Sequence, residues 1–152
     1  MTTPRGSMQL RPRKRSRRSA AAIAAIVAIA AGCASVETPV VADPGVAFTL
    51  PLGKTAAVSG NGTRITFNRV TDDSRCPVDV VCVWAGDAKL ELTISRNSAP
   101  AETRVVSITP PNNELVSGDL RIRLVGLAPA PRQSEPSAGR AYVAQLVVTP
   151  AG

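Results

Sequence analysis

The chain of 152 residues contains no histidine, and its aromatic residues are limited to one tryptophan, one tyrosine and two phenylalanines. Without histidine, Ser-His-Asp and Cys-His catalytic arrangements are excluded, and no imidazole can activate a cysteine nucleophile. So few aromatic rings provide no series of stacking platforms for single-stranded nucleic acid. Both methionines, Met1 and Met8, lie near the N-terminus, so the later part has no thioether ligand for a soft metal. These absences argue against most hydrolases, a metal carrier and a nucleic-acid-binding protein.

Acidic residues are missing from the first 32 positions, which hold seven of the 18 basic residues. The remaining 11 basic residues equal the 11 acids, so the part after Cys33 has a formal charge of zero. The high isoelectric point therefore belongs to the N-terminal segment alone. A nucleic-acid partner requires a basic surface that displaces counterions, and the later part offers no such excess.

No apolar run is long enough to span a bilayer. A basic segment, Arg11 to Arg18, precedes an apolar run from Ala20 to Ala31, which has 12 residues where about 20 are needed. This layout is that of a cleaved secretory signal, and Met8 is an alternative start because the segment from there is already complete. Ser16-Arg17-Arg18 resembles a twin-arginine signal, although alanines stand where bulky apolar residues are usual.

The segment Ala30-Ala31-Gly32-Cys33 resembles a bacterial lipobox. The resemblance implies that residues 1–32 are a lipoprotein signal peptide and that Cys33 is lipidated, which explains an odd cysteine in an exported protein. Several acyl chains would give a stable membrane anchor. Ala34 follows the cysteine in place of aspartate, a pattern that resembles lipoproteins of the outer membrane facing the periplasm. The alternative is ordinary cleavage after Ala30, which gives a soluble periplasmic or secreted protein.

Residues 33–45 are interpreted as the lipidated cysteine and a flexible tether, and residues 46–150 as one β domain. Apolar and polar residues alternate in most of its segments, for example with Ala88, Leu90, Leu92 and Ile94 on one face. Asn61-Gly62 predicts a type I′ hairpin turn. The sequence thus predicts an all-β fold, an antiparallel β-sandwich (Ig-like or Greek-key) or a small barrel. The expected strands are 46–52, 54–58, 63–70, 88–95, 103–108, 120–127 and 142–148.

Cys76 and Cys82 lie on either side of five residues, about 20 Å apart if the chain were extended, whereas a disulfide needs about 4.4–6.8 Å. Pro77 and Asp79 supply turn chemistry that brings the sulfurs together. We therefore predict a Cys76–Cys82 disulfide outside the cytoplasm. A zinc site is disfavoured because neither histidine nor a second cysteine pair is present, and we predict no metal and no cofactor.

The stretch 72–87 around this disulfide is the candidate binding loop. Trp84 is expected to pack on the disulfide in the core, with exposure for ligand stacking as the alternative. Ala85 and Gly86 indicate close approach of another group. Arg75 is expected to clamp the loop through bidentate bonds to an acid, and anion binding is the alternative. The candidate residues of this loop are Asp72, Asp73, Arg75, Asp79, Trp84 and Asp87. Calcium would use the same acids, but the usual D-x-[DN]-x-[DN]-G pattern is absent.

The run Asp73-Ser74-Arg75-Cys76-Pro77, with Cys82, Trp84-Ala85-Gly86 and Ala88, resembles a motif of small bacterial secreted proteins and lipoproteins of unknown function. The resemblance covers about residues 46–150 and implies an extracytoplasmic β domain without implying a chemistry.

The sequence as a whole favours a lipid-anchored, non-catalytic binding or interaction module of the cell envelope that presents the 72–87 loop. The alternatives are an inhibitor of an envelope protease and a purely structural envelope lipoprotein. A hydrolase with two carboxylates, such as Asp79 and Asp87, is a further hypothesis. Beyond the membrane reached through the lipid, the partner, an envelope protein or a small ligand, is not identified, and nucleic acid is not expected.

Overall fold

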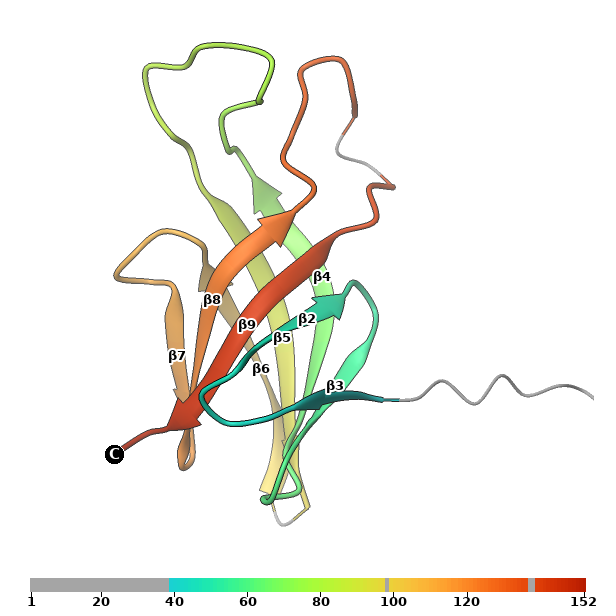
Figure 1. Cartoon of the computed structure of the whole chain (residues 1–152), viewed down its shortest axis with the longest axis vertical. Coiled ribbons are helices and arrows are strands. Elements are labelled where there is room, and N and C mark those ends of the chain that lie inside the picture. The colour runs from blue at the N-terminus through green and yellow to red at the C-terminus, as the bar shows by residue number, and fades with distance from the viewer. Residues whose placement is uncertain (1–38, 98, 137–138) are drawn as a thin grey trace, which may run out of the picture. The chain divides into compact units, whose positions relative to one another are not determined.

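The computed structural model describes residues 39–97, 99–136 and 139–152. The predictions for the signal peptide, the lipobox and Cys33 lie outside these residues. The described residues form nine strands and no helix (Figure 1). The strands in chain order are β1 (Val40–Ala42), β2 (Ala47–Pro51), β3 (Thr55–Val58), β4 (Arg64–Asp73), β5 (Ala88–Arg96), β6 (Ala99–Ser107), β7 (Glu114–Ser117), β8 (Leu120–Ala128) and β9 (Val143–Pro150).

The strands form two sheets. One has the order β1-β3-β4-β5-β6 and the other β2-β9-β8-β7. Every neighbouring pair is antiparallel except β1 and β3, which run parallel. Both sheets keep open edges, so the fold is a sandwich and not a closed barrel. The predicted all-β, antiparallel sandwich is confirmed.

The core lies between the sheets and follows the alternation of the sequence. On β5, Ala88, Leu90, Leu92 and Ile94 are buried, and the residues between them face outward. Both sheets contribute apolar side chains, with Phe67 the largest that is fully buried. Within the described ranges, the buried hydrophobic residues of the core fall between residues 42 and 148.

Four features differ from the sequence predictions. β1 lies inside the segment interpreted as a tether, because Ala42 is buried and its carbonyl accepts the Ser59 amide. β7 was not predicted, since four residues are too few for a clear alternation. β4 and β6 are longer than expected. The hairpin between β3 and β4 exists, but Gly60 and Gly62 have positive φ in place of Asn61, so the type I′ assignment is wrong.

A row of threonines crosses the outer face of the five-stranded sheet. Thr55, Thr66, Thr93 and Thr103 are successive register partners on β3, β4, β5 and β6. The hydroxyls of Thr55 and Thr66 lie 2.8 Å apart, and those of Thr93 and Thr103 lie 3.0 Å apart. Such cross-strand pairs stabilise a sheet by about 0.2–1 kcal/mol each and fix its register.

Two irregularities interrupt the pairing of β4 with β5, and the last residue of β4 still faces the core. The pairing with β5 shifts between Phe67 and Arg69 and again between Val70 and Asp72. Because each shift moves the alternation by one residue, the two cancel. Asp73 therefore faces the same side as Phe67, opposite the buried Ala88, and its side chain is 3% exposed.

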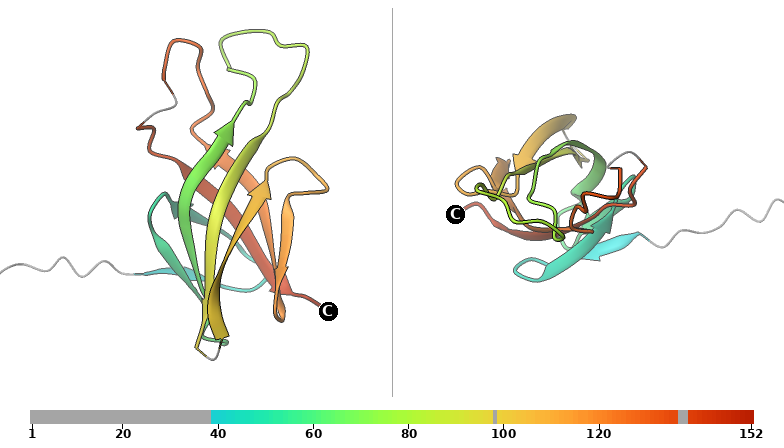
Figure 2. Two further views of the ribbon diagram at one scale, coloured as in Figure 1. Left: turned by 180° about the vertical axis from the view of Figure 1, so that it is seen from behind. Right: turned by 90° about the horizontal axis from the view of Figure 1, so that it is seen from above.

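The loop that joins β4 to β5 and the loop that joins β8 to β9 lie at the same end of the domain (Figures 1 and 2). We call residues 74–87 the cysteine loop and residues 129–142 the proline-rich loop. The sandwich positions both, because β4 and β5 pair as far as Asp73 and Ala88, and β8 and β9 pair as far as Ala128 and Val143.

Candidate functional site

The cysteine loop continues the β4–β5 hairpin beyond its last strand residues. The Ser74 amide donates to the Asp87 carbonyl at 2.8 Å, and the Cys76 amide donates to the Ala85 carbonyl at 2.9 Å. Cys76 and Cys82 form the predicted disulfide, with their Cα atoms 5.9 Å apart. The loop is therefore closed twice, by backbone bonds at its base and by a covalent bond nearer its end.

Gly86 is required where the two arms of the loop meet. It has a φ of +70°, and a Cβ added to it would overlap the carbonyl of Ser74 and lie 2.9 Å from Cα of Arg75. The predicted close approach therefore exists, and the approaching group is backbone. A side chain at this position is disfavoured both by φ and by space.

Arg75 is a clamp, as predicted. Its Nε and Nη2 donate to the two carboxylate oxygens of Asp73 at 2.7 and 2.9 Å. Two further donors reach the end of β8 and the residue after it, with Nη1 2.5 Å from the Leu127 carbonyl and Nη2 3.0 Å from the Pro129 carbonyl. The Arg75 side chain, 14% exposed, thus joins the base of the cysteine loop to the start of the proline-rich loop, and these bonds use four of its five N–H donors.

The proline-rich loop sends two more side chains to the same carboxylate. The Tyr142 hydroxyl donates to Oδ2 of Asp73 at 2.8 Å, and Nη1 of Arg140 lies 3.5 Å from that oxygen. Nη2 of Arg140 donates to the Glu135 carbonyl at 3.0 Å. We call Asp73, Arg75, Arg140 and Tyr142 the Asp73 cluster. Two guanidiniums face one carboxylate here, and backbone carbonyls accept the additional donors.

The electrostatics of this cluster favour an ionised Asp73. Burial acts to raise the pKa of Asp73, but the hydrogen bonds from Arg75 and Tyr142 outweigh it and leave the pKa below its ordinary value. Burial and the neighbouring Asp73 carboxylate raise the pKa of Tyr142. Both oxygens of the Asp73 carboxylate accept hydrogen bonds, which is the arrangement of a structural anchor.

Further contacts hold the end of the cysteine loop against the proline-rich loop. The Val78 amide donates to the Pro131 carbonyl at 3.0 Å. Oδ1 of Asp79 accepts the Gln133 amide at 2.9 Å, and this bond is the main cause of a lowered pKa at Asp79. Three contacts between the loops, at Arg75, Val78 and Asp79, therefore fix the cysteine loop along its length.

Asp87 and Asp72 play different parts. Burial acts to raise the pKa of Asp87, but the hydroxyls of Ser107 and Thr109, which donate to its carboxylate at 2.7–2.9 Å, lower it on balance. Asp87 thus ties the base of the loop to the end of β6. Asp72 is exposed and pairs through its backbone position with Lys89. The structure gives Asp79 and Asp87 separate partners and does not bring them together on a shared group.

The end of the cysteine loop exposes apolar side chains, and we call residues 78–84 the tip. Trp84 is 83% exposed, so the expectation that it packs in the core is wrong and the alternative of an exposed ring holds. Val78, Val81 and Val83 are 59%, 101% and 91% exposed. Sequence reasoning missed these valines, although the segment 78–84 holds four valines and a tryptophan with Asp79 as its one charged residue, which was a usable signal. The polar groups of the loop thus bond to the rest of the domain, whereas its apolar side chains face solvent.

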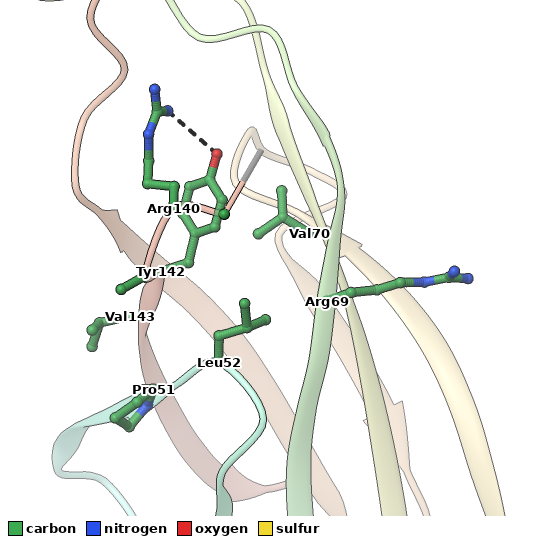
Figure 3. Close-up of a pocket in the computed structure, with 9 residues that line it drawn as sticks. Pro51, Leu52, Arg69, Val70, Arg140, Tyr142 and Val143 are labelled. Carbon is green, nitrogen blue, oxygen red and sulfur yellow. Dashed lines mark hydrogen bonds between the residues drawn. The ribbon is translucent and has the colours of Figure 1, made fainter. Parts of the chain in front are cut away.

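A shallow cavity of about 500 Å³ lies beside the Asp73 cluster, between β2, β4 and the proline-rich loop. Its walls include Leu52, Val70 and Tyr142 (Figure 3). The side chain of Arg69 extends away from these residues, and it pairs with Glu91 at 2.7 Å. Arg140 is directed toward Tyr142 and its own loop. The walls of the cavity are thus mainly apolar, and the polar groups of Arg140 and Tyr142 beside it bond to each other.

Among the described residues, no group of three or more cysteine or acidic side chains is placed to hold a metal ion. Within the same ranges no helix is long and apolar enough to cross a membrane. The disulfide is compatible with an extracytoplasmic location.

No family model, curated protein or solved structure matches this chain. The resemblance to small secreted proteins and lipoproteins stays a prediction from the motif.

Proposed function

We propose that the protein is a lipid-anchored binding module of the bacterial cell envelope and that the tip of the cysteine loop is its binding surface. One observation carries the proposal: Val81, Val83 and Trp84 are each more than four-fifths exposed on a loop that is otherwise clamped. Isolated exposed apolar residues are common on protein surfaces, whereas a contiguous group marks an interaction site.

The clamps support a role in recognition. A loop held by a disulfide, by Arg75 and by two bonds to the proline-rich loop loses little conformational entropy when it binds. An exposed tryptophan adds a large contact area with few rotatable bonds. The scaffold therefore presents the tip in one conformation.

The test is photo-crosslinking in cells. A photoreactive amino acid in place of Val81 should form a discrete adduct, whereas the same group at Val105, an exposed valine on β6, should not. Equal adducts at both positions, or none at the tip, would contradict the assignment of the tip as the binding surface.

The anchor is tested separately by mass spectrometry of the purified protein and by fractionation. We expect an acylated Cys33 at the N-terminus, and the membrane fraction should hold less of the Cys33→Ser variant than of the parent protein. A protein that keeps residues 1–32 and stays in the cytoplasm would refute the proposed location.

A further inference from the structure

The tip lacks the groups that most protein interfaces use around their apolar centre. Between residues 76 and 86 only Asp79 and Trp84 have side-chain nitrogen or oxygen atoms. Asp79 already accepts the Gln133 amide. A specific protein interface has a polar rim and about one hydrogen bond per 100–200 Å². The tip instead offers apolar surface and one indole, which suits a partner that demands few directional bonds.

The small size of the tip further restricts the kind of partner that it can bind. A standard protein interface uses about 20–30 residues on each side, and the tip has seven residues, 78–84. A second copy joined tip to tip would therefore form only a small contact. A lipid bilayer needs no preformed complementary pocket, and tryptophan is enriched at its headgroup boundary. Two valines beside an indole suit that boundary, because the ring can place its apolar part in the bilayer while its N–H stays in contact with water.

The proposed anchor places a bilayer within reach. Five residues, 34–38, separate Cys33 from the described chain, so Cys33 and Pro39 can be at most about 20 Å apart. A domain of this length has a radius of gyration of about 13 Å. β1 joins the domain at its flank, and the cysteine loop lies at one end of the long axis (Figures 1 and 2). A domain that lies along the bilayer can thus bring both points to one surface.

We propose that the tip inserts Val81, Val83 and Trp84 into the headgroup boundary of a lipid bilayer, as a second attachment beside the lipidated cysteine. This inference rests on the proposed function, because it takes the tip as the binding surface. The part of the chain after Cys33 has no net charge, so the insertion requires neither anionic lipid nor low salt. The anchor keeps the local concentration of lipid high, so weak insertion is sufficient.

The experiment uses residues 33–152 with Cys33→Ser, which contain the entire described core. The probes are vesicles of phosphatidylcholine and vesicles of phosphatidylethanolamine with phosphatidylglycerol. Trp84 is the sole tryptophan, so its fluorescence reports the tip alone. We expect its emission to shift to shorter wavelength with both lipids and at high salt, brominated lipid to quench it, and the protein to float with the vesicles.

The matched variants are V81S/V83S at the tip and V105S/V116S on exposed strand positions. The tip variant should partition about tenfold less, because two valine side chains no longer gain from leaving water. The strand variant should partition like the parent protein. Far-UV circular dichroism and thermal unfolding check that both variants stay folded. The insertion would be overturned if the Trp84 emission does not shift and the protein does not float with either lipid. Equal binding by V81S/V83S and the parent protein would also overturn it.

The crosslinking in cells separates this inference from the proposed function. Adducts of the tip to lipid support both. A discrete protein adduct together with no vesicle binding assigns the tip to an apolar pocket of a partner protein, which overturns the insertion and keeps the binding surface. No adduct and no vesicle binding contradict both.

Discussion

The Tyr142 hydroxyl donates a hydrogen bond of 2.8 Å to the carboxylate of Asp73, 69 residues away in the chain. This bond joins the end of β4 to the last residue before β9, and so connects the two sheets at the end that holds both loops. The donor is the hydroxyl of a buried tyrosine and the acceptor is a nearly buried carboxylate, so the bond gives each of these buried polar groups a partner.

The Tyr142→Phe variant should lower the free energy of unfolding by about 1–2 kcal/mol. The substitution keeps the ring and removes one donor to a buried charge. Urea unfolding followed by far-UV circular dichroism measures the change. A variant as stable as the parent protein would show that Arg75 and Arg140 satisfy Asp73 without the hydroxyl.

The Arg75→Met variant should be destabilised by about 3 kcal/mol, because it leaves the Asp73 carboxylate buried with fewer partners and frees two carbonyls. Arg123→Met is the matched control. Arg123 also pairs with an acid, Glu114, but its side chain is 50% exposed. Exposed pairs contribute about 0–1 kcal/mol, so the control should change stability little. Equal effects in urea unfolding would contradict the clamp.

The Gly86→Ala variant should be destabilised by more than about 2 kcal/mol, because the new Cβ overlaps the backbone of Ser74. Gly60→Ala is the control, with a φ of +86° and no atom within 4 Å of the added Cβ. It tests the cost of positive φ alone, about 1 kcal/mol. The difference between the two melting temperatures measures the close approach. Equal melting temperatures would exclude that approach in solution.

Stability should fall as the solution is acidified. In the folded protein the pKa values of Asp73 and Asp87 lie below that of an unfolded aspartate, which is about 3.9. Their contribution is therefore present above pH about 4, and it is lost as the pH falls toward the lower folded values, since the unfolded chain then binds more protons. Urea unfolding at a series of pH values measures the slope. Tyr142→Phe should reduce it, because one of the bonds that lowers the Asp73 pKa is gone.

The double variant Cys76→Ser with Cys82→Ser should lose about 2 kcal/mol, the chain-entropy value for so short a loop. The sandwich should remain folded, since the clamps at Arg75, Val78 and Asp79 do not involve sulfur. Amide hydrogen exchange should rise within residues 76–86 and stay unchanged in β5 and β9. Collapse of the whole fold would show that the disulfide supports more than its own loop.

Patterns in the sequence were sufficient to predict seven of the strands and, for β5, the face that it buries. β5 shows why: each inward residue is apolar and each outward one is polar, so only one register buries the right side. β1 and β7 could not be predicted, because three or four residues form too short a pattern. β1 pairs with β3 across the intervening β2, and β7 is the short arm of a tight hairpin with β8.

The candidate site was only partly predictable. The disulfide and the Arg75 clamp follow from local spacing and from the geometry of a guanidinium. Arg140 and Tyr142 lie near the far end of the chain, and only the folded topology brings them to Asp73. The error about Trp84 has a physical cause. Burying its ring requires a loop folded back on the sandwich, whereas the bonds to Pro131 and Gln133 hold the loop outward.

The short parallel β1 determines how the domain would respond to mechanical load. It is joined to the sheet through three register pairs with β3, and Ala42 is its one fully buried side chain. A pull on the chain ahead of Val40 therefore peels β1 away first, while the longer antiparallel pairs stay closed. Release of its three residues would lengthen the tether by about 10 Å and leave the other strand pairs of both sheets intact. Detachment of β1 would thus take up the first extension of the chain before the rest of the domain is strained.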